Sequence, residues 1–391
     1  MMKFKKRIIR ISRSQIKTIF LLLIGIGLIY FLMPSQTKDS IIKIKDPDKK
    51  MEKFVFDGVL ENKNTFDDKY VSMLYIDDNK YKSHLINLKK MEEVNYSDFV
   101  NKNNLEEFNN TIKDLLLKKY PSFIVDMLVN NSNAEYSFEE DNLYIYYYLN
   151  ESIETIKSFN IKIDYDYIAN FLNFKVKTDE KYDYEDGYAI DTSKVSISIT
   201  FDDGPNNEKT IAILNALEDY KMSSTFFMVG YKLENDIETV KKVSESHSEI
   251  GYHSYAHQYF TKQKTSDITR EFQISDNTLF NITGKHFQLT RPPYGSYNKT
   301  VLNSIDTPFI RWNLDTNDWK YKDVDYIKSY VLNNLKDGAI ILFHDSYQTS
   351  VEAATELFKI LYLKDIQVLS VSKLAELKNI DLEAHEVYYS F

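Results

Sequence analysis

The 391-residue sequence has no cysteine. This absence excludes disulfide bonds, thiolate zinc sites, iron–sulfur clusters and a cysteine nucleophile, so any bound metal must be held by His, Asp or Glu. The H-E-x-x-H, G-x-S-x-G and protein-kinase motifs are also missing, which disfavours zincins, serine hydrolases and kinases. A basic surplus is absent too, because the net charge is −9, and this argues against a general nucleic-acid binder.

The chain is rich in apolar and aromatic side chains. Hydrophobic residues make up 43% of it, and it contains 30 Tyr and 24 Phe. This composition excludes a mainly disordered protein. The length is typical of two or three domains and is sufficient for a sizeable core.

The positive charges are unevenly distributed. Residues 1–35 hold seven of the 49 basic side chains and none of the 58 acidic ones, so the rest of the chain carries a net charge of −16. The uncharged run IFLLLIGIGLIYFLM (19–33) follows, and with its neighbours it is about long enough to span a membrane. A cleavable signal peptide is the alternative, although no A-x-A site follows the run. The positive-inside rule predicts a cytoplasmic N-terminus and an extracellular body.

We therefore expect six segments in the chain. They are a basic cytoplasmic tail (1–17), a single-pass transmembrane signal anchor (18–35), a stalk (36–53), a small α+β extracytoplasmic domain (54–175), a linker (176–193) and an α/β catalytic domain (194–380).

The small domain mixes helical and strand-like patterns. Apolar spacing predicts a helix over 105–120 that ends at Pro121. Aromatic and β-branched runs predict strands over 54–60, 70–77 and 143–150. No catalytic constellation is found in this domain, and its partner is left open.

After Lys194, short apolar runs alternate with helical segments. Near-continuous apolar strands separated by helices are typical of parallel strands covered by helices. Seven such runs indicate a complete or distorted (β/α) barrel, in which the active site lies at the carboxyl ends of the strands. The predicted strands cover 195–200, 224–229, 249–253, 286–290, 309–314, 339–344 and 366–370.

Charged or titratable residues follow five of these runs. Three of the seven histidines in the chain are among them. Such a concentration at one end of the predicted barrel is improbable by chance. The residues are Asp202, Asp203, His253, His257, Arg291, Asp315, Asp318, His344 and Asp345.

Three of these residues are candidate ligands for a metal ion. His253 and His257 form an i, i+4 pair, which one helical turn would place on a common face. Asp203 completes a three-ligand site of the zinc type with room for water. Asp202 can then accept a proton, because a metal-bound Asp is a poor general base. His344, on another strand, can protonate a leaving group.

Two further residues are expected to set the charge states of Asp202 and His344. Arg291 can hold Asp202 ionised and oriented, and Asp315 can keep His344 protonated through an ion pair. Taken singly, each signal has a structural alternative, since adjacent Asp residues commonly form turns or helix caps.

Five motifs in order resemble the NodB-homology domain of the polysaccharide deacetylases, carbohydrate esterase family 4. They extend over residues 194–375, about half of the chain. The motifs are TFDDGP (200–205), HSYAH (253–257), RPPYG (291–295), DTNDW (315–319) and LFHD (342–345).

The resemblance implies a distorted (β/α) barrel of the NodB type and a divalent metal. The metal would be Zn²⁺ most commonly, with Co²⁺ or Mn²⁺ as alternatives, and Asp203, His253 and His257 would bind it. Asp202 would be the base and His344 the acid.

The resemblance also implies the substrate contacts. The backbone N–H of Tyr294 would donate to the oxyanion. Trp319 and Leu342 would enclose the acetyl methyl group, and Pro292 would contact the substrate from the RPPYG motif.

The implied reaction is hydrolysis of an N-acetyl group on a hexosamine, with release of acetate. A catalytic domain tethered outside the cell faces the wall, so the expected substrate is N-acetylglucosamine of peptidoglycan, and free amines there would reduce lysozyme binding. Two alternatives stay open. One is a deacetylase of chitin-like oligomers, poly-N-acetylglucosamine or acetyl-xylan, and the other is a membrane-anchored sensor of the wall or of lysozyme with an inactive barrel.

Overall fold

The computed structural model describes residues 56–391, except 79, 154–155, 177 and 179–186. The predicted tail, transmembrane anchor and stalk therefore lie outside the described residues. Within the described part, no helix is both long and apolar enough to cross a membrane. By internal contacts, the chain divides into one unit of residues up to Tyr96 with Ser137–Glu140, and a second unit of Ser97–Tyr136 with Asp141–Phe391.

The first unit contains an antiparallel four-stranded sheet of order β1-β2-β3-β4. Asp67 and Asp68 connect the first two strands with φ of 51° and 49°. This left-handed backbone matches the twist of a tight hairpin, and Asp adopts it more readily than most residues. The strands are β1 (Val59–Phe66), β2 (Tyr70–Asp77), β3 (Lys80–Asn87) and β4 (Glu92–Val94).

The second unit begins with two helices and a sheet of order β5-β6-β7, in which β6 and β7 pair antiparallel and the last two residues of β5 are grouped with the first unit. The helix predicted over 105–120 is confirmed as α2 (Leu105–Lys119). Its stripe of apolar side chains is buried, and Pro121 cannot continue the helix because proline clashes with the preceding turn. The other elements are α3 (Ser122–Asn131), β5 (Ser132–Phe138), β6 (Asn142–Ile153) and β7 (Ile156–Asp164).

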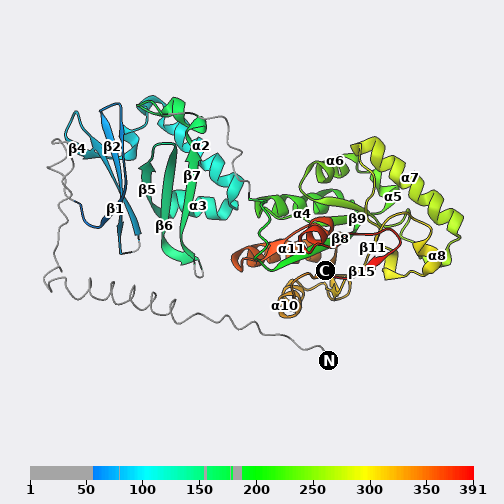
Figure 1. Cartoon of the computed structure of the whole chain (residues 1–391). Helices are drawn as coiled ribbons and strands as arrows, with labels where there is room; N and C mark the ends of the chain where they lie inside the picture. Colours follow the sequence, from blue (N-terminus) through cyan, green and yellow to red (C-terminus); the bar gives the residue numbers. More distant parts are fainter. Residues whose placement is uncertain (1–55, 79, 154–155, 177, 179–186) are drawn as a thin grey trace, which may run out of the picture. The chain divides into compact units, whose positions relative to one another are not determined.

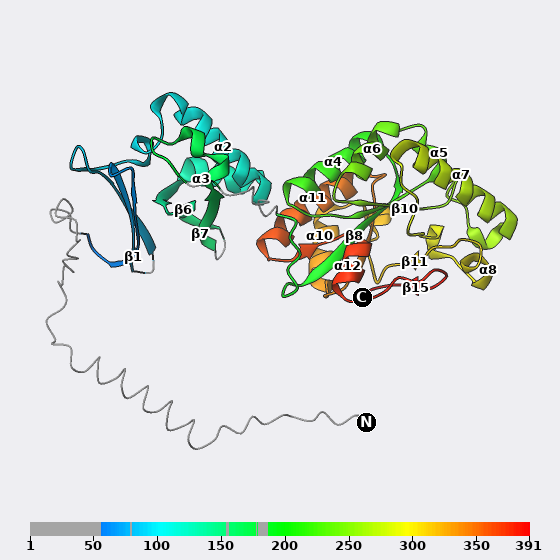
Figure 2. The same cartoon turned by 45° about the horizontal axis from the view of Figure 1, so that its top comes forward.

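The rest of this unit has parallel strands surrounded by helices (Figures 1 and 2). The strand order is β10-β9-β8-β13-β12, and β14 pairs with the other edge of β8. Single bridges join Tyr252 to Thr290 and Thr290 to Phe309, and β11 pairs with β15. The strands are β8 (Ser196–Gly204), β9 (Thr225–Met228), β10 (Glu249–Tyr252), β11 (Phe309–Ile310), β12 (Leu314–Asp315), β13 (Ile340–His344), β14 (Gln367–Val368) and β15 (Val387–Tyr388).

Two of the strands predicted after Lys194 do not form continuous strands, and this makes the barrel irregular. The run 286–290 forms only the bridge at Thr290. The run 309–314 divides into β11 and the start of β12, because Arg311 N–H donates to Tyr388 O whereas Asn313 N–H donates to Ile340 O. The chain thus changes its hydrogen-bonding neighbour within three residues.

The helices follow from apolar stripes and local caps. Asp236 and Asp323 accept hydrogen bonds from backbone N–H groups in the first turns of α6 and α10, which satisfies donors that the helix itself leaves free. The helices are α4 (Asn207–Asp219), α5 (Gly230–Leu233), α6 (Ile237–Glu245), α7 (Thr265–Thr283), α8 (Lys299–Leu302), α9 (Asp318–Tyr321), α10 (Val324–Asn334), α11 (Gln348–Leu363) and α12 (Val371–Leu377).

The core surrounds β8, which is buried on both faces. Ile197, Ile199 and Phe201 belong to the main hydrophobic cluster, and the alternating Ser196, Ser198 and Thr200 are fully buried too. A parallel strand that has helices on one face and the side chains of the barrel interior on the other is buried on both faces. This rigid strand carries two of the predicted site residues at its carboxyl end.

Candidate active site

Strand register brings the predicted site residues to one end of the barrel. Asp202 and Asp203 lie near the end of β8, and His344 is the last residue of β13, directly paired with Asp202. His253 follows the last residue of β10, and its N–H donates to Met228 O. The prediction that these groups meet at the carboxyl ends of parallel strands is confirmed.

Asp203, His253 and His257 form a cluster that could hold a metal. One ligand atom from each lies within 4.8 Å of the others. The Nε2 atoms of His253 and His257 are 3.7 and 3.1 Å from Asp203 Oδ1. Asp203 Oδ1 is buried and has no hydrogen bond, which is an unfavourable state for a carboxylate oxygen unless a cation satisfies it. The donor set therefore fits a divalent metal with two His ligands and one carboxylate.

The orientation of His253 also suits metal binding. Its Nδ1 lies 2.9 Å from Arg291 O, so this nitrogen carries the proton and Nε2 is left with its lone pair toward Asp203. Burial lowers the pKa of His253 to about 3, so its imidazole is neutral. The neutral ring is the form that ligates a metal.

The local reason for the His253–His257 pairing is not the helical turn that we predicted. Residues 253–257 form an irregular loop, and Ser254 and His257 have φ of 63° and 52°. The chain folds back through these left-handed residues, which brings the two imidazole centroids to 5.1 Å. Asp203 also has a positive φ, of 77°. Such conformations persist only where surrounding structure enforces them, and they concentrate at functional sites.

The predicted pair of Arg291 and Asp202 is confirmed. Arg291 Nη1 lies 2.8 Å from Asp202 Oδ1, and the guanidinium is fully buried. Its other N–H groups donate to Thr200 Oγ1, Ile310 O and Arg311 O, so four of the five N–H groups of this buried guanidinium have partners. Burial raises the pKa of Asp202, and the charge of Arg291 opposes that rise. A carboxylate in this environment is a better base than one in water.

The carboxylate partner of His344 is Asp318, and the prediction of Asp315 is wrong. His344 Nδ1 lies 2.8 Å from Asp318 Oδ1. Asp318 Oδ2 accepts from the backbone N–H of His344 and from Ser350 Oγ. Asp315 instead accepts from the backbone N–H of Asn317. Asn317 has a φ of 52°, and this left-handed turn directs the next residue, Asp318, inward as the first residue of α9.

The environment of His344 favours its charged form. Burial alone would lower its pKa, but the hydrogen bond and charge of Asp318, together with the charges of Asp202 and Asp203, raise the pKa of His344 to about 9. The imidazole is therefore protonated at neutral pH and can donate a proton.

The predicted substrate residues differ in exposure. Tyr294 and Trp319 are 54% and 48% exposed, whereas Leu342 and Pro292 are buried. The Tyr294 ring lies 4.8 Å from the His257 ring, so it borders the candidate metal site. Tyr294 also has a φ of 59°, which turns the backbone sharply within the RPPYG segment.

Comparison with known proteins supports a common family. A family model described as "Polysaccharide deacetylase" matches residues 189–307. The peptidoglycan-N-acetylmuramic acid deacetylase PdaC of Bacillus subtilis is 34% identical over 189 residues, which are 48% of this chain and 40% of PdaC. The peptidoglycan-N-acetylglucosamine deacetylase PgdA of Listeria monocytogenes is 36% identical over 154 residues, which are 39% of this chain and 33% of PgdA.

A third relative is matched over most of its length. A peptidoglycan-N-acetylglucosamine deacetylase of Bacillus cereus is 33% identical over 180 residues, which are 44% of this chain and 84% of that protein. This chain belongs to the polysaccharide deacetylase family. The similarity to PdaC and PgdA covers less than half of the length of either protein.

A buried network in this deacetylase domain was missed at the sequence level. Asp345 is fully buried and accepts from Asn206 Nδ2 and Thr210 Oγ1, and burial raises its pKa to about 6. Lys232 Nζ donates to Asp203 O at 2.7 Å and to Asn206 Oδ1 at 3.1 Å. The network thus ties the segment after β8 to the residue that follows His344. The sequence signals at Asp345 were its position directly after a predicted strand and its place in the LFHD motif.

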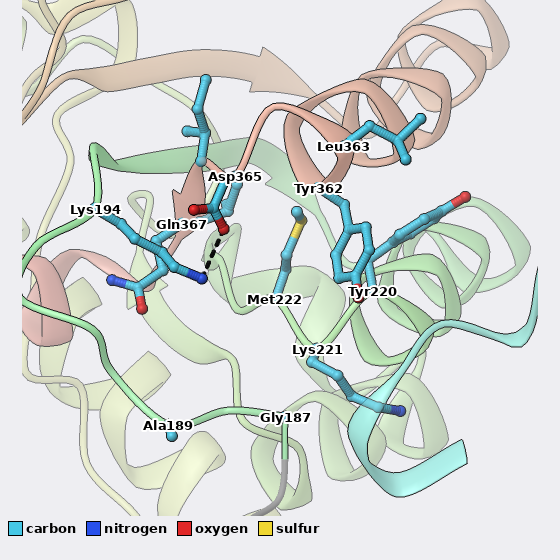
Figure 3. Close-up of a pocket in the computed structure, with 12 residues that line it drawn as sticks. Gly187, Ala189, Lys194, Tyr220, Lys221, Met222, Tyr362, Leu363, Asp365 and Gln367 are labelled. Carbon is cyan, nitrogen blue, oxygen red and sulfur yellow. Dashed lines mark ion pairs between the residues drawn. The ribbon is translucent and has the colours of Figure 1, made fainter. Parts of the chain in front are cut away.

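A separate pocket lies at the opposite end of β8 (Figure 3). Its volume is about 390 Å³. Lys194 and Asp365 form an ion pair of 2.7 Å on one side of it, and Tyr220 and Tyr362 lie together on the other. Lys194 precedes β8, whereas Asp202 and Asp203 lie near its carboxyl end, so this pocket of the deacetylase domain contains none of the predicted site residues.

Proposed function

We propose that this protein is a metal-dependent deacetylase that removes N-acetyl groups from a cell-wall glycan, with N-acetylglucosamine of peptidoglycan as the preferred unit. One observation carries the proposal. The cluster of Asp203, His253 and His257 adjoins two buried charge pairs, Asp202–Arg291 and Asp318–His344, at the ends of neighbouring strands. Amide hydrolysis of this kind requires a base, an acid and a metal site. All three candidates lie together at the carboxyl ends of the barrel strands.

The metal ligands would be Asp203, His253 and His257. A divalent metal, of which Zn²⁺ is our first choice, would act as a Lewis acid toward the acetamide carbonyl and lower the pKa of water. His253 is prepared for this role, since Arg291 O fixes its tautomer.

Asp202 and His344 would then move the protons. Asp202 Oδ2 would accept a proton from the attacking water, while Arg291 holds Oδ1 in place at 2.8 Å. His344 Nε2 would deliver a proton to the departing amine nitrogen, because Nδ1 is committed to Asp318. The backbone N–H of Tyr294 would donate to the oxyanion of the tetrahedral intermediate. The C–N bond breaks as the amine takes up the proton, and acetate is released.

The names of the relatives support a peptidoglycan substrate. PgdA is named for N-acetylglucosamine and PdaC for N-acetylmuramic acid. The names agree on peptidoglycan but differ in the sugar, so the choice of N-acetylglucosamine needs its own test. The experiment that tests it is treatment of purified peptidoglycan with the full-length protein, followed by mass spectrometry of the muropeptides. Loss of one acetyl group from glucosamine supports the proposal. Loss from muramic acid alone, or acetate release only from chitin oligomers or acetyl-xylan, contradicts the substrate assignment.

We also propose that the N-terminus anchors the protein in the cell membrane with the catalytic domain outside. The support is sequence alone: seven basic residues precede an uncharged apolar run over 19–33. Fractionation of cells that produce the full chain, with protease added from outside, tests the topology. Recovery of the whole protein from the soluble fraction contradicts it.

A further inference from the structure

Arg311 lies beside the turn that carries the proposed oxyanion donor. Tyr294, whose N–H we assign to the oxyanion, and Gly295 are consecutive residues with φ of 59° and 60°. A left-handed conformation is unfavourable for a tyrosine, so it persists only where its surroundings enforce it. Arg311 Nη1 donates a hydrogen bond to Gly295 O, two peptide units after the Tyr294 N–H. The guanidinium is therefore in a position to hold the turn.

The contact between Arg311 and the turn is close. A Cβ at position 295 would collide with the guanidinium, so only glycine leaves room for it there. Within the turn, Gly295 N–H donates to Pro292 O at 2.9 Å and Ser296 N–H donates to Pro293 O at 3.1 Å. These internal bonds close the turn, while Arg311 holds its last carbonyl from outside.

Aromatic rings hold the guanidinium of Arg311 in place. Its Cζ lies 4.8 Å from the ring centroid of Trp312, 5.3 Å from that of Tyr389 and 5.9 Å from that of Tyr297. A guanidinium within about 6 Å of an aromatic face is attracted by the ring electrons. The hydroxyls of Tyr297 and Tyr389 are 3.0 Å apart, so these two rings are also joined to each other. The guanidinium thus has neighbours that restrict its movement.

The backbone of Arg311 is fixed on both sides. Its N–H donates to Tyr388 O at 2.7 Å, and its carbonyl accepts from Arg291 Nη2 at 3.1 Å. Tyr388 belongs to β15, which pairs with β11 directly before Arg311. The side chain of Arg311 therefore extends toward the turn from a rigid point, and that point also supports the arginine partner of Asp202.

We propose that Arg311 is a positioning residue, which fixes the left-handed turn at Tyr294 and Gly295 and so presents the Tyr294 N–H to the oxyanion. Arginine suits this role because its planar fork donates to a carbonyl and stacks on rings at the same time. The inference rests on the proposed function and deepens it. Arg311 lies between RPPYG and DTNDW and outside all five motifs, so the motifs do not contain the whole support of the site.

The experiment measures acetate release from peptidoglycan by the full-length protein and its variants. Arg311→Met keeps an apolar stem but removes the donor and the charge. It should lower kcat about ten-fold or more and change KM less than about two-fold, because an oxyanion donor acts mainly in the transition state. Arg311→Lys keeps the charge without the planar fork and should recover only part of the loss.

Binding of a transition-state mimic separates positioning from a loss of folded protein. The probe is a glucosamine disaccharide that carries a methylphosphonamidate in place of the acetamide, because its tetrahedral oxygens resemble the oxyanion. In Arg311→Met its inhibition constant should rise about as much as kcat/KM falls. A smaller folded fraction would lower kcat but leave the inhibition constant unchanged, so that result overturns the positioning role.

The ring contact supplies a second test and a control. Tyr389→Ala should lower kcat several-fold, whereas Tyr389→Phe, which keeps the ring, should change it less than about two-fold. Arg270→Met is the matched control, since Arg270 is an exposed arginine that pairs with Asp267 on α7, and it should leave kcat unchanged.

Two results distinguish failure of this inference from failure of the proposed function. An unchanged kcat in folded Arg311→Met overturns the inference, and if that variant does not fold, an unchanged kcat in both Arg311→Lys and Tyr389→Ala does so. Absence of acetate release by the unaltered protein would instead count against the proposed function.

Discussion

The substitution Asp318→Asn tests how the protein keeps His344 protonated. It removes the negative charge 2.8 Å from the imidazole but retains an oxygen that can accept from Nδ1. The pKa of His344 is about 9, compared with an ordinary value of 6.5, which corresponds to about 3 kcal/mol in favour of the charged ring. Without the carboxylate, burial still lowers the pKa of His344 while the charges of Asp202 and Asp203 still raise it, so we expect a value near the ordinary 6.5.

The expected effect depends strongly on pH. At pH 8 an imidazole with a pKa of 9 is about 90% protonated, whereas one with a pKa of 6.5 is about 3% protonated. If His344 is the acid, deacetylation by Asp318→Asn should therefore fall about 30-fold at pH 8 but less than about two-fold at pH 6. The assay is a pH profile of acetate release from peptidoglycan, with NMR titration of the His344 ring as an independent reading of the pKa.

Asp315→Asn is the matched control, because both residues belong to DTNDW. Among the contacts that the structure gives, the Asp315 carboxylate accepts only from Asn317 N–H, so the Asp315→Asn variant should keep the pH profile unchanged. A profile altered by Asp315→Asn but not by Asp318→Asn would refute the pairing. An equal loss of activity at pH 6 and pH 8 in Asp318→Asn would refute the explanation through the pKa of His344.

The same pair makes a prediction for stability. Because the folded pKa of His344 is raised above 6.5, the stabilisation of about 3 kcal/mol is complete below pH 6.5 and is lost as pH rises through about 9. Urea unfolding of the unaltered protein at pH 6.5 and pH 9.5 should show this decline, and Asp318→Asn should lack it.

Three further predictions concern the rest of the site. Asp203→Ala should abolish both metal binding, measured by elemental analysis after dialysis, and acetate release; full turnover in the metal-free variant would contradict the metal assignment. Arg291→Met leaves Asp202 buried without its cation, so the free energy of unfolding in urea should fall by about 3–5 kcal/mol; a change below about 1 kcal/mol would mean that the pair is not buried as described. Gly204→Ala places a Cβ 2.5 Å from Asp345 Oδ2, so unfolding should need about 1–3 kcal/mol less, and an unchanged urea midpoint would contradict the close approach.

Local patterns in the sequence determined much of the fold and of the candidate site. The helix over 105–120 could be predicted because its apolar spacing and Pro121 act within one segment. The buried β8 strand could be predicted because its bulky apolar residues alternate with small Ser and Thr and not with charged side chains, which suits a parallel strand covered on both faces. Placement of Asp202, Asp203 and His344 at one edge followed from the rule that parallel strands end together.

Other features depended on neighbours that are distant in sequence. The run 309–314 looks like one strand, but Arg311 and Asn313 hydrogen-bond to different partners, and no local pattern shows where that change occurs. His253 and His257 come together through left-handed loop residues, whereas their spacing alone suggested a helical turn.

The sequence by itself thus determined which residue types stand at the strand ends, and the tertiary structure decided which of them touch. Asp315 and Asp318 are three residues apart in one motif and equally acidic. Only the left-handed turn at Asn317 and the packing of α9 bring Asp318 to His344. The carboxylate of Asp345 likewise has partners distant in sequence, since it accepts from Asn206 and Thr210. Side-chain direction is set by backbone conformation and long-range packing, and neither is fixed by the order of residues along a short motif.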